Sequence, residues 1–305
     1  MTRPRAPRED LALDSEAVLR LVSDAIRDRT GAAPATCEVE LLKRTDRRLV
    51  VLYGFGLPSA TIPVVGKWYG TDRAPVVADA LAQLRSAGFA GAALAVPDVI
   101  LCVPDAGALF TSWEQGVVLR QRLREEQASA TGAGRWIAAF HGSGFRSPRS
   151  CGPDKQRRAV GRWIEAAPQL RHVAVALDGA LASRSDPELP VHYDYYHSQI
   201  LTDEARTIVL DLDEAGLGDP AFDLAHFAAH LRLLALQWFD DPRAFEPAIE
   251  SFRGGYAEGG GTAAPDPVMD AFAWFKLAHQ CVARGRPDLE WRYAVAEADR
   301  ALATV

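Results

Sequence analysis

The stretch that decides the fold runs from residue 191 to residue 224 and reads VHYDYYHSQILTDEARTIVLDLDEAGLGDPAFDL. It opens with a His-x-Asp triplet, His192 to Asp194, and Gln199 follows five residues after that aspartate. Asp211 ends an apolar, β-type run, so we expect it at the end of a strand. Acids at strand ends tend to face an opening, because burying them without partners costs free energy. Asp194, Gln199 and Asp211 are oxygen donors that suit Mg²⁺ rather than Zn²⁺.

Two parts of this stretch resemble the motifs of a known family. HYDYYHSQIL, residues 192–201, resembles the catalytic loop HxDxxxxN of aminoglycoside phosphotransferases and related choline- and sugar-type kinases. LDLDEAGLGDPAFDLA, residues 210–225, is similar to that family's IDWxDAGxGDPxxDLA segment, its counterpart of the protein-kinase DFG motif. The two motifs occur in the family's order, with Asp194 and Asp211 17 residues apart. The resemblance is specific for the family and says little about the substrate.

The resemblance implies a role for each matching residue. Asp194 takes the position of the catalytic carboxylate, which accepts or orients the proton of the acceptor hydroxyl, and His192 takes that of a residue that braces the loop. Asp211 matches the aspartate that would hold Mg²⁺ between the β- and γ-phosphates, where the ion neutralises charge as the phosphoryl group transfers. Gln199 stands where the family has a magnesium-binding Asn, with a side chain one methylene longer. Asp219 and Asp223 match acids that order the loop.

The first part of the chain mostly follows strand-like patterns. Residues 1–12 are expected to be disordered, and a helix is predicted at about 14–29, with Asp14 or Ser15 as its N-cap. Short β-rich runs separated by polar or turn residues predict five strands: 37–42, 48–55, 60–69, 99–103 and 108–113. One further helix is predicted between them, with four apolar residues on one face: 72–87, with Val76, Ala80, Leu84 and Ala87.

Helical patterns dominate the second part of the chain. Four helices are predicted before the motifs: 117–128, 133–142, 155–167 and 171–183. Strand-like pieces follow at 189–194 and 206–213, and helices are expected from Pro220 to the end. The fold class is therefore α+β, a two-lobed plan with a small β-rich lobe before a larger, mainly helical lobe. The predicted boundaries are a nucleotide-binding lobe at 1–112, a hinge at 113–116, and a catalytic and acceptor-binding lobe at 117–305.

Four residues of the first lobe are candidates for binding the nucleotide. The resemblance implies that Lys67, on the third predicted strand, reaches the phosphates, and that backbone groups near Trp113 meet the adenine. Arg44, in the basic turn KRTDRR, is a candidate for the phosphates, with an ordinary solvated turn as the alternative. The family's glutamate partner for the lysine is absent from helix 72–87, which leaves Asp79 as the nearest acid.

Composition limits the partners and the compartment. The net charge of −6 argues against a general nucleic-acid binder, and no stretch reaches the roughly 18 apolar residues of a membrane helix. The charged N-terminus lacks an apolar signal core, and the four scattered cysteines read as free thiols, so we expect a cytoplasmic protein. Nothing in the sequence predicts the oligomeric state.

Charge is unevenly distributed along the chain. The first 150 residues hold 19 Lys and Arg against 16 Asp and Glu, whereas the remainder holds 15 against 24. This asymmetry suits a polyphosphate on one side and a cation on the other, with chance distribution of surface charge as the alternative. It is the reason why the sequence favours a cationic acceptor such as an amino sugar.

Several neighbouring side chains have two interpretations. Tyr193, Tyr195 and Tyr196 either shape the acceptor site or pack the loop. His226 and His230 have the i, i+4 spacing of zinc ligands, but without the glutamate of HExxH they are predicted to be core or interface residues.

The sequence therefore predicts a small-molecule kinase that uses ATP or GTP and Mg²⁺ to phosphorylate a hydroxyl of a polar metabolite or antibiotic, with an aminoglycoside or amino sugar as the favoured class. The main alternative is a non-catalytic pseudokinase that binds a nucleotide or partner, because Gln199 and the missing glutamate depart from the family pattern. A metal-dependent hydrolase is a third interpretation, which the order of the motifs disfavours.

Overall fold

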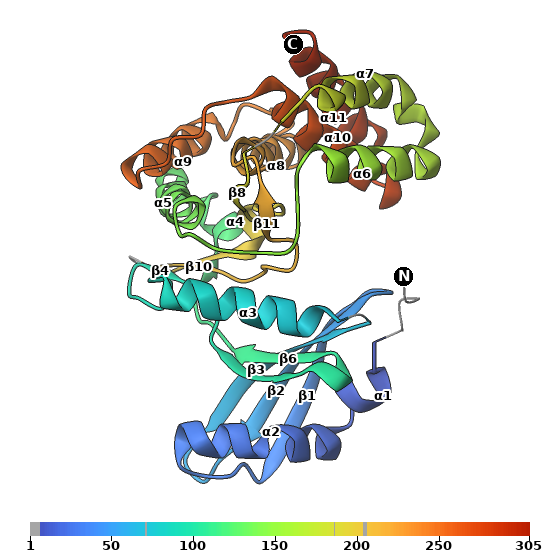
Figure 1. The fold of residues 1–305 in the computed structure, drawn as a ribbon. Coiled ribbons are helices and arrows are strands. Elements are labelled where there is room, and N and C mark those ends of the chain that lie inside the picture. Colours follow the sequence, from blue (N-terminus) through green and yellow to red (C-terminus); the bar gives the residue numbers. More distant parts are fainter. Residues whose placement is uncertain (1–6, 71, 186, 204–205) are drawn as a thin grey trace. The chain divides into compact units, whose positions relative to one another are not determined.

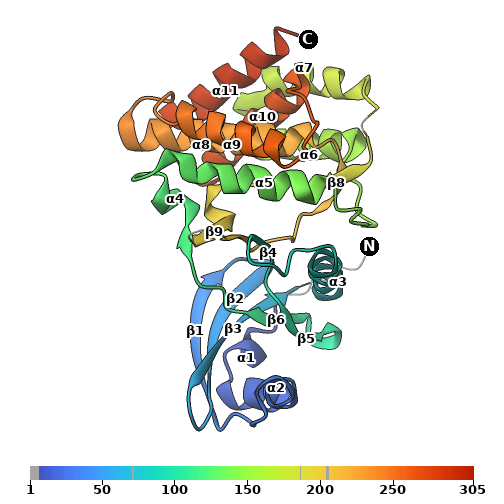
Figure 2. The same ribbon diagram turned by 90° about the vertical axis from the view of Figure 1, so that its left-hand side faces the viewer.

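The computed structural model describes residues 7–70, 72–185, 187–203 and 206–305. The chain divides into two compact units, Met1–Gln115 and Gly116–Val305 (Figures 1 and 2). The first contains a five-stranded sheet and the second is mainly helical, as the α+β plan predicts. No helix in the described parts of the chain is long and apolar enough to cross a membrane.

The sheet of the first unit is antiparallel, with strand order β1-β2-β3-β6-β5. Its strands are β1 (Thr36–Arg44), β2 (Arg48–Gly56), β3 (Thr61–Tyr69), β5 (Val99–Val103) and β6 (Ala108–Ser112), and the short β4 (Leu94–Ala95) precedes β5. Strand β2 alternates strictly between buried and half-buried side chains, because successive residues point to opposite faces of a sheet. The buried face includes Leu49, Val51, Tyr53 and Phe55.

Two helices pack against this buried face, α1 (Glu9–Ala12) and α2 (Ser15–Thr30). The Asp14 carboxylate caps α2 by accepting a hydrogen bond from the backbone N–H of Ala17, and Gly31 ends the helix with a φ of 80°. The expectation of disorder over residues 1–12 is therefore wrong for Glu9–Ala12, which form helix α1 and bury Ala12. Residues 1–6 lie outside the described part of the chain.

Helix α3 (Arg73–Ser86) packs along β3, β5 and β6, and it buries two of the four residues predicted for its apolar face, Ala80 and Leu84, but not Val76 and Ala87. Val76 is 47% exposed, whereas Ala74, Val77, Ala80, Leu81 and Leu84 are buried. The helix is apolar on more than one side, so spacing alone does not select the buried face.

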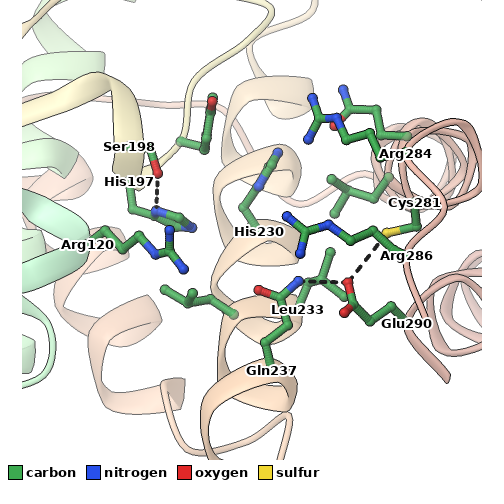
Figure 3. A pocket seen from close by; sticks show the side chains of 14 residues that line it. Arg120, His197, Ser198, His230, Leu233, Gln237, Cys281, Arg284, Arg286 and Glu290 are labelled. Carbon is green, nitrogen blue, oxygen red and sulfur yellow. Dashed lines mark hydrogen bonds between the residues drawn. The ribbon is translucent and has the colours of Figure 1, made fainter. Parts of the chain in front are cut away.

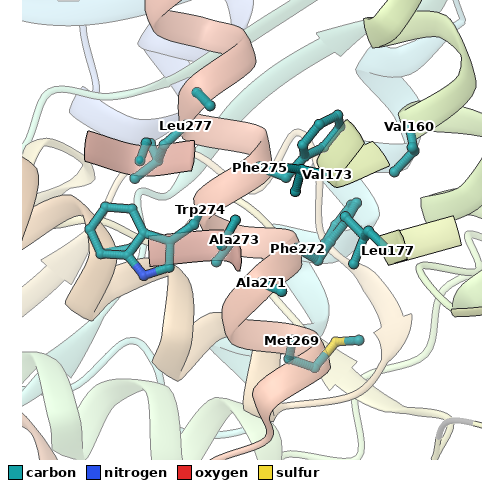
Figure 4. Close-up of a cluster of buried hydrophobic side chains, with 14 of the residues drawn as sticks. Val160, Val173, Leu177, Met269, Ala271, Phe272, Ala273, Trp274, Phe275 and Leu277 are labelled. Carbon is teal, nitrogen blue, oxygen red and sulfur yellow. The ribbon is translucent and has the colours of Figure 1, made fainter. Parts of the chain in front are cut away.

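The core of the second unit is built around α10. Its helices are α4 (Leu119–Arg122), α5 (Ala130–His141), α6 (Pro153–Ala166), α7 (Arg171–Ala182), α8 (Ala221–Phe239), α9 (Glu246–Glu258), α10 (Pro267–Ala283) and α11 (Asp288–Leu302). Figure 4 shows Phe272 and Phe275 of α10 beside apolar side chains of α6 and α7, with Trp274 on the other side of the helix. Trp274 is fully buried and is a core residue.

Three short strands and one two-stranded ribbon position the motifs. Strand β9 (Ile200–Asp203) lies between β7 (Val117–Val118) and β10 (Arg206–Val209), and β8 (Leu189–Val191) pairs with β11 (Gly216–Gly218). The predicted helix 117–128 is wrong, because its first residues pair with β9 and only Leu119–Arg122 forms a short α-helix. Strand β9 lies in the segment that the sequence left as a connection.

Helices α5 and α9 approach each other so closely that their contact requires glycine. A Cβ atom on Gly134 would lie 2.0 Å from the carbonyl oxygen of Phe252, and one on Gly255 would lie 2.1 Å from that of Thr131. These separations are far below van der Waals contact, so the two backbones touch directly. The position of α5 is thereby fixed against α9.

Candidate active site

A buried carboxylate holds the loop that carries Asp194. Asp223, in the first turn of α8, is fully buried and accepts hydrogen bonds from the backbone N–H of His192 at 2.7 Å and of Tyr193 at 2.8 Å. Nε2 of His141 lies 3.1 Å from the same carboxylate. Tyr193 adopts a φ of 67°, a left-handed backbone conformation that residues other than glycine rarely adopt. Asp223 therefore orders the loop, as the sequence predicted.

Asp219 organises the start of the same helix. Its Oδ1 accepts a hydrogen bond from the backbone N–H of Ala221 at 2.9 Å, and its Oδ2 accepts one from Arg184 at 2.8 Å. Arg184 also donates to Asp266 at 2.7 Å, just before α10. The aspartates of the GDPxxD turn thus connect the catalytic loop to two helices.

His192 packs among aromatic rings. Its side chain is fully buried, and its ring centroid lies 5.3 Å from that of Tyr195 and 6.3 Å from that of Trp136. Neither ring nitrogen has a hydrogen-bond partner among the described residues. Burial lowers the pKa of His192 below its usual value, although nearby carboxylates, Asp223 first, oppose this shift. The geometry supports the predicted bracing role, exerted through packing by a neutral ring.

Asp194 forms an ion pair with a lysine that the sequence analysis did not single out. Nζ of Lys276, on α10, lies 3.0 Å from Asp194 Oδ1 and donates to the carbonyl oxygen of Tyr193 at 2.8 Å. The Lys276 side chain is 9% exposed and that of Asp194 is 31% exposed. Burial raises the pKa of Asp194, but the Lys276 ammonium, its hydrogen bond and His230 lower it more, so the net shift is downward. The carboxylate is therefore ionised at neutral pH and is positioned by Lys276.

A weak signal for Lys276 does exist in the sequence. The residue stands in the run AFAWFKLAH, in which all residues from Ala271 to Ala278 except Lys276 are apolar. A lysine is almost never buried without a partner, so a single lysine inside an apolar helix indicates a specific contact. Its partner, 82 residues away, could not be identified without the fold.

Replacing Lys276 with methionine is expected to move the acid limb of the pH profile of kcat/KM to higher pH. The substitution removes the ammonium that lowers the pKa of Asp194 and leaves the burial that raises it. Lys276→Arg keeps the positive charge and should leave the acid limb near its wild-type position. Rate measurements between about pH 4 and 9 test this, given the ordinary aspartate pKa of about 3.9. An identical acid limb in the Met and Arg variants would contradict the role of the lysine.

The candidate magnesium ligands Asp211 and Gln199 lie close together at the end of one hairpin. Strands β9 and β10 pair with Val209 opposite Ile200, and the backbone N–H of Leu210 donates to the carbonyl oxygen of Gln199 at 3.0 Å. This pairing makes Gln199 a direct neighbour of the residue that precedes Asp211. Asp211 also contributes to the electrostatics of Asp194, because its negative charge raises the pKa of that carboxyl.

The donor chemistry of this pair fits Mg²⁺. A carboxylate and an amide carbonyl are hard oxygen donors, and Mg²⁺ is often held by one or two protein groups together with phosphates and water. The described residues contain no group of three or more His, Cys, Asp or Glu arranged to hold a metal by themselves. The site thus suits an ion that arrives with a nucleotide rather than a metal caged by protein.

Two of the residues predicted to bind the nucleotide, Lys67 and Arg44, lie on strands of the first unit. Lys67 lies on β3, opposite Val50 of β2 and Leu109 of β6, and is only 9% exposed. Arg44 ends β1 and forms an ion pair with Glu9 of α1. The KRTDRR turn connects β1 to β2 as a hairpin.

The other two candidates of this unit, Asp79 and Trp113, are exposed. Asp79, on α3, accepts a hydrogen bond from Nε2 of Gln83 at 2.7 Å. Trp113 follows β6 and is 41% exposed. The roles predicted for Lys67, Arg44, Asp79 and Trp113 stay predictions.

Two of the three tyrosines in the loop of Asp194 pack that loop. Tyr195 packs the loop, because it is fully buried and its hydroxyl donates to the carbonyl oxygen of Ala133 on α5 at 2.8 Å. Tyr193 also packs, with its ring centroid 4.8 Å from that of Phe222. Tyr196 instead lines a pocket beside the loop and stacks on His230, with 4.3 Å between ring centroids.

Comparisons with solved structures show which fold this is. The chain is similar to a choline/ethanolamine kinase family protein from Mesorhizobium loti, with 17% identity, a TM-score of 0.63 and 94% of each chain covered. It is similar to a choline kinase from Streptococcus pneumoniae, with 14% identity, a TM-score of 0.63, and 94% of this chain and 99% of that chain covered. An aminoglycoside phosphotransferase in ternary complex with ADP and hygromycin B matches with 15% identity, a TM-score of 0.60, and 92% and 98% coverage. These likenesses confirm the predicted two-lobed, protein-kinase-like fold.

The sequence itself shows the family. No curated protein matches the chain in sequence. A family model described as the phosphotransferase enzyme family (APH) matches residues 69–275, which is more than half of the 305 residues. The match includes the loop of Asp194 and the segment of Asp211. The chain therefore belongs to the phosphotransferase enzyme family.

Proposed function

We propose that the protein transfers the γ-phosphoryl group of ATP or GTP to a hydroxyl group of a small polar molecule in the cytoplasm. The observation that carries this proposal is the catalytic loop, in which a buried aspartate fixes two backbone amides and a lysine aligns the ionised Asp194. Such positioning together with electrostatics accounts for most of catalysis in phosphoryl transfer. Solved relatives of the fold contain ADP or a non-hydrolysable ATP analogue, which supports a nucleotide as co-substrate.

In this proposal Asp194 accepts or orients the proton of the acceptor hydroxyl while His192 braces the loop. Asp211 and Gln199 would hold Mg²⁺, which supplies charge neutralisation at the phosphates when it is bound. Lys67 binds the nucleotide phosphates with Asp79 as its acidic partner, Arg44 offers a further cation to the phosphates, and the backbone near Trp113 meets the adenine.

The acceptor is the least determined part of the proposal. The names of the structural relatives point to acceptors as different as choline, aminoglycosides and macrolides. At 20% identity or less, these names say nothing about the acceptor of this chain. An aminoglycoside or amino sugar is the class that the sequence favours.

A product screen tests the proposed function. The protein is incubated with Mg²⁺ and either ATP or GTP against aminoglycosides, amino sugars, sugar acids, nucleosides and amino alcohols, and the products are read by mass spectrometry. We expect the mass of one acceptor class to increase by one phosphate, only when nucleotide is present. Nucleotide-independent hydrolysis of any compound would instead support the metal-dependent hydrolase.

The pseudokinase remains the second candidate, because Asp194 is ion-paired and Gln199 replaces the family's asparagine. Titration of ATP with and without Mg²⁺ separates the two functions. A pseudokinase binds the nucleotide and yields no phosphorylated product from any acceptor in the screen.

Substitutions of Gln199 test the proposed metal site. Gln199→Asn shortens the side chain by one methylene and restores the family's ligand, so the Mg²⁺ concentration that gives half-maximal rate should stay the same or fall. Gln199→Ala removes the amide oxygen and should raise that concentration several-fold, by analogy with the loss of one polar contact worth about 1 kcal/mol. Initial rates measured across a Mg²⁺ titration give both values. Equal magnesium dependence in the Ala variant and the wild type would show that Gln199 is no ligand.

A further inference from the structure

A pocket of about 180 Å³ in the second unit lies against the catalytic loop. Tyr196, His197 and Ser198, which stand between Asp194 and Gln199 in the sequence, form one of its walls. A larger pocket of about 490 Å³ is lined by residues of α8, α9 and α10, but no residue between 191 and 199 lines it. The smaller pocket is therefore the one adjacent to the proposed chemistry.

Three arginines line the smaller pocket. Figure 3 shows Arg120 extending from one side and Arg286 from the other toward the space beside His230, with Arg284 above them. Among the described residues, none of the three forms an ion pair with an acid, whereas seven other arginines of this unit do. These guanidinium groups carry fixed positive charge, because arginine stays protonated in proteins.

One acid lines the pocket with them, and its single negative charge offsets only one of the three positive charges. Glu290 is buried, and Oε2 of its carboxylate accepts a hydrogen bond from Nε2 of Gln237 at 2.7 Å and faces Sγ of Cys281 at 3.9 Å. The pocket is therefore positive through its arginines.

The helix that carries Lys276 connects this pocket to Asp194. Leu277 and Gln280 of α10 line the pocket, one residue and about one turn beyond Lys276. His230 lines it from α8. The pocket therefore shares α10 with the lysine that pairs with Asp194.

The Lys276 ammonium and the three arginines of the pocket both disfavour a cationic acceptor. Lys276 already places an ammonium at 3.0 Å from Asp194, so this carboxylate has a cationic partner within the protein. The three arginines beyond it repel a second cation and attract an anion. This chemistry differs from that of the amino sugars favoured by the charge of the second half of the chain.

We propose that this pocket binds an oxyanion, a carboxylate or a phosphate, that belongs to the acceptor molecule. The inference rests on the proposed function and narrows its substrate to anionic alcohols. The acceptor oxygen forms a bond to the γ-phosphorus, the bond from that phosphorus to the β–γ bridging oxygen breaks, and the nucleoside diphosphate leaves. The hydroxyl proton passes to the Asp194 carboxylate. Arg120 and Arg286 hold the anion at the other end of the acceptor.

The first experiment measures binding and needs no turnover. Inorganic phosphate is titrated calorimetrically into the full-length protein in the presence of saturating ADP and Mg²⁺, so that the nucleotide site is occupied. The double variant Arg120→Gln/Arg286→Gln should weaken phosphate binding about tenfold or more, the loss expected for two charge-assisted hydrogen bonds. Arg157→Gln serves as control, because Arg157 is paired with Asp178 between α6 and α7. Equal phosphate affinity in all three proteins would overturn the proposal.

The second experiment compares acceptors that share one skeleton: glucose, glucosamine, glucuronate and glucose 6-phosphate. We expect a higher kcat/KM for an anionic member than for glucose, and the double variant should abolish that preference, whereas Arg157→Gln should retain it. Preference for glucuronate identifies a carboxylate and preference for glucose 6-phosphate identifies a phosphate. Preference for glucosamine overturns the inference while leaving the proposed kinase intact. Arginine-dependent phosphate binding without any phosphorylated product overturns the kinase and retains the anion site.

Discussion

Asp194→Asn is expected to reduce phosphoryl transfer by about 10²–10⁴-fold, the contribution typical of a positioned general base. The amide has nearly the shape of the carboxylate, but it cannot accept the proton of the acceptor hydroxyl. It also removes the charge that Lys276 pairs with at 3.0 Å. Because Asp194 is not proposed to contact the nucleotide directly, the affinity for nucleotide should stay close to that of the wild type.

Two measurements on the same preparation establish this result. The rate of nucleotide-dependent product formation is followed by mass spectrometry, and nucleotide binding by calorimetry. Asp178→Asn is the matched control, because Asp178 forms a surface ion pair with Arg157 between α6 and α7. Unchanged turnover in Asp194→Asn would remove the residue from the chemistry, and joint loss of turnover and nucleotide binding would indicate that the loop had collapsed.

Asp223→Ala should destabilise the second unit by about 3–5 kcal/mol, the cost usually found when a buried charged partner is removed. The substitution leaves two buried backbone N–H groups, of His192 and Tyr193, without the acceptor that they have at 2.7 and 2.8 Å. Each orphaned donor costs about 1–3 kcal/mol. The strained φ of Tyr193 also loses the contact that maintains it, so turnover should fall with stability.

Urea unfolding followed by tryptophan fluorescence measures this loss, since five buried or half-buried tryptophans of the second unit report on its unfolding: Trp136, Trp163, Trp238, Trp274 and Trp291. Glu258→Gln provides the comparison, because the pair that Glu258 forms with Arg135 lies on the surface and should contribute less than about 1 kcal/mol. A free energy of unfolding within experimental error of the wild type for Asp223→Ala would contradict the structural role assigned to this carboxylate.

The sequence predicts the elements whose patterns are local. Neighbouring residues alone predict the alternation of buried and half-buried side chains in residues 48–55 and the aspartate that caps α2. The structure confirms both. The segment from 117 was predicted as helix because its apolar spacing fits one, yet its first two residues pair with β9, about 84 residues away. Long-range pairing of this kind overrides local preference.

The candidate site follows the same division. The family motifs locate Asp194 and Asp211 because the motifs are contiguous in sequence. The motifs do not locate Lys276, because its partner Asp194 can be identified only from the folded chain, in which α10 packs beside the loop. They do not locate the arginine-lined pocket either, because Arg120 and Arg286 belong to segments that meet only in the folded chain.

The glycine contact between α5 and α9 has a consequence for anyone who compares homologues of this protein. Gly134 and Gly255 leave no room for a Cβ atom, so no other residue can replace either of them unless the two helices separate. Separation would move the carbonyl of Ala133, which holds Tyr195, and thus disturb the catalytic loop at a distance. An alignment should therefore show two invariant glycines remote from every reacting atom, and their conservation would record architecture rather than chemistry.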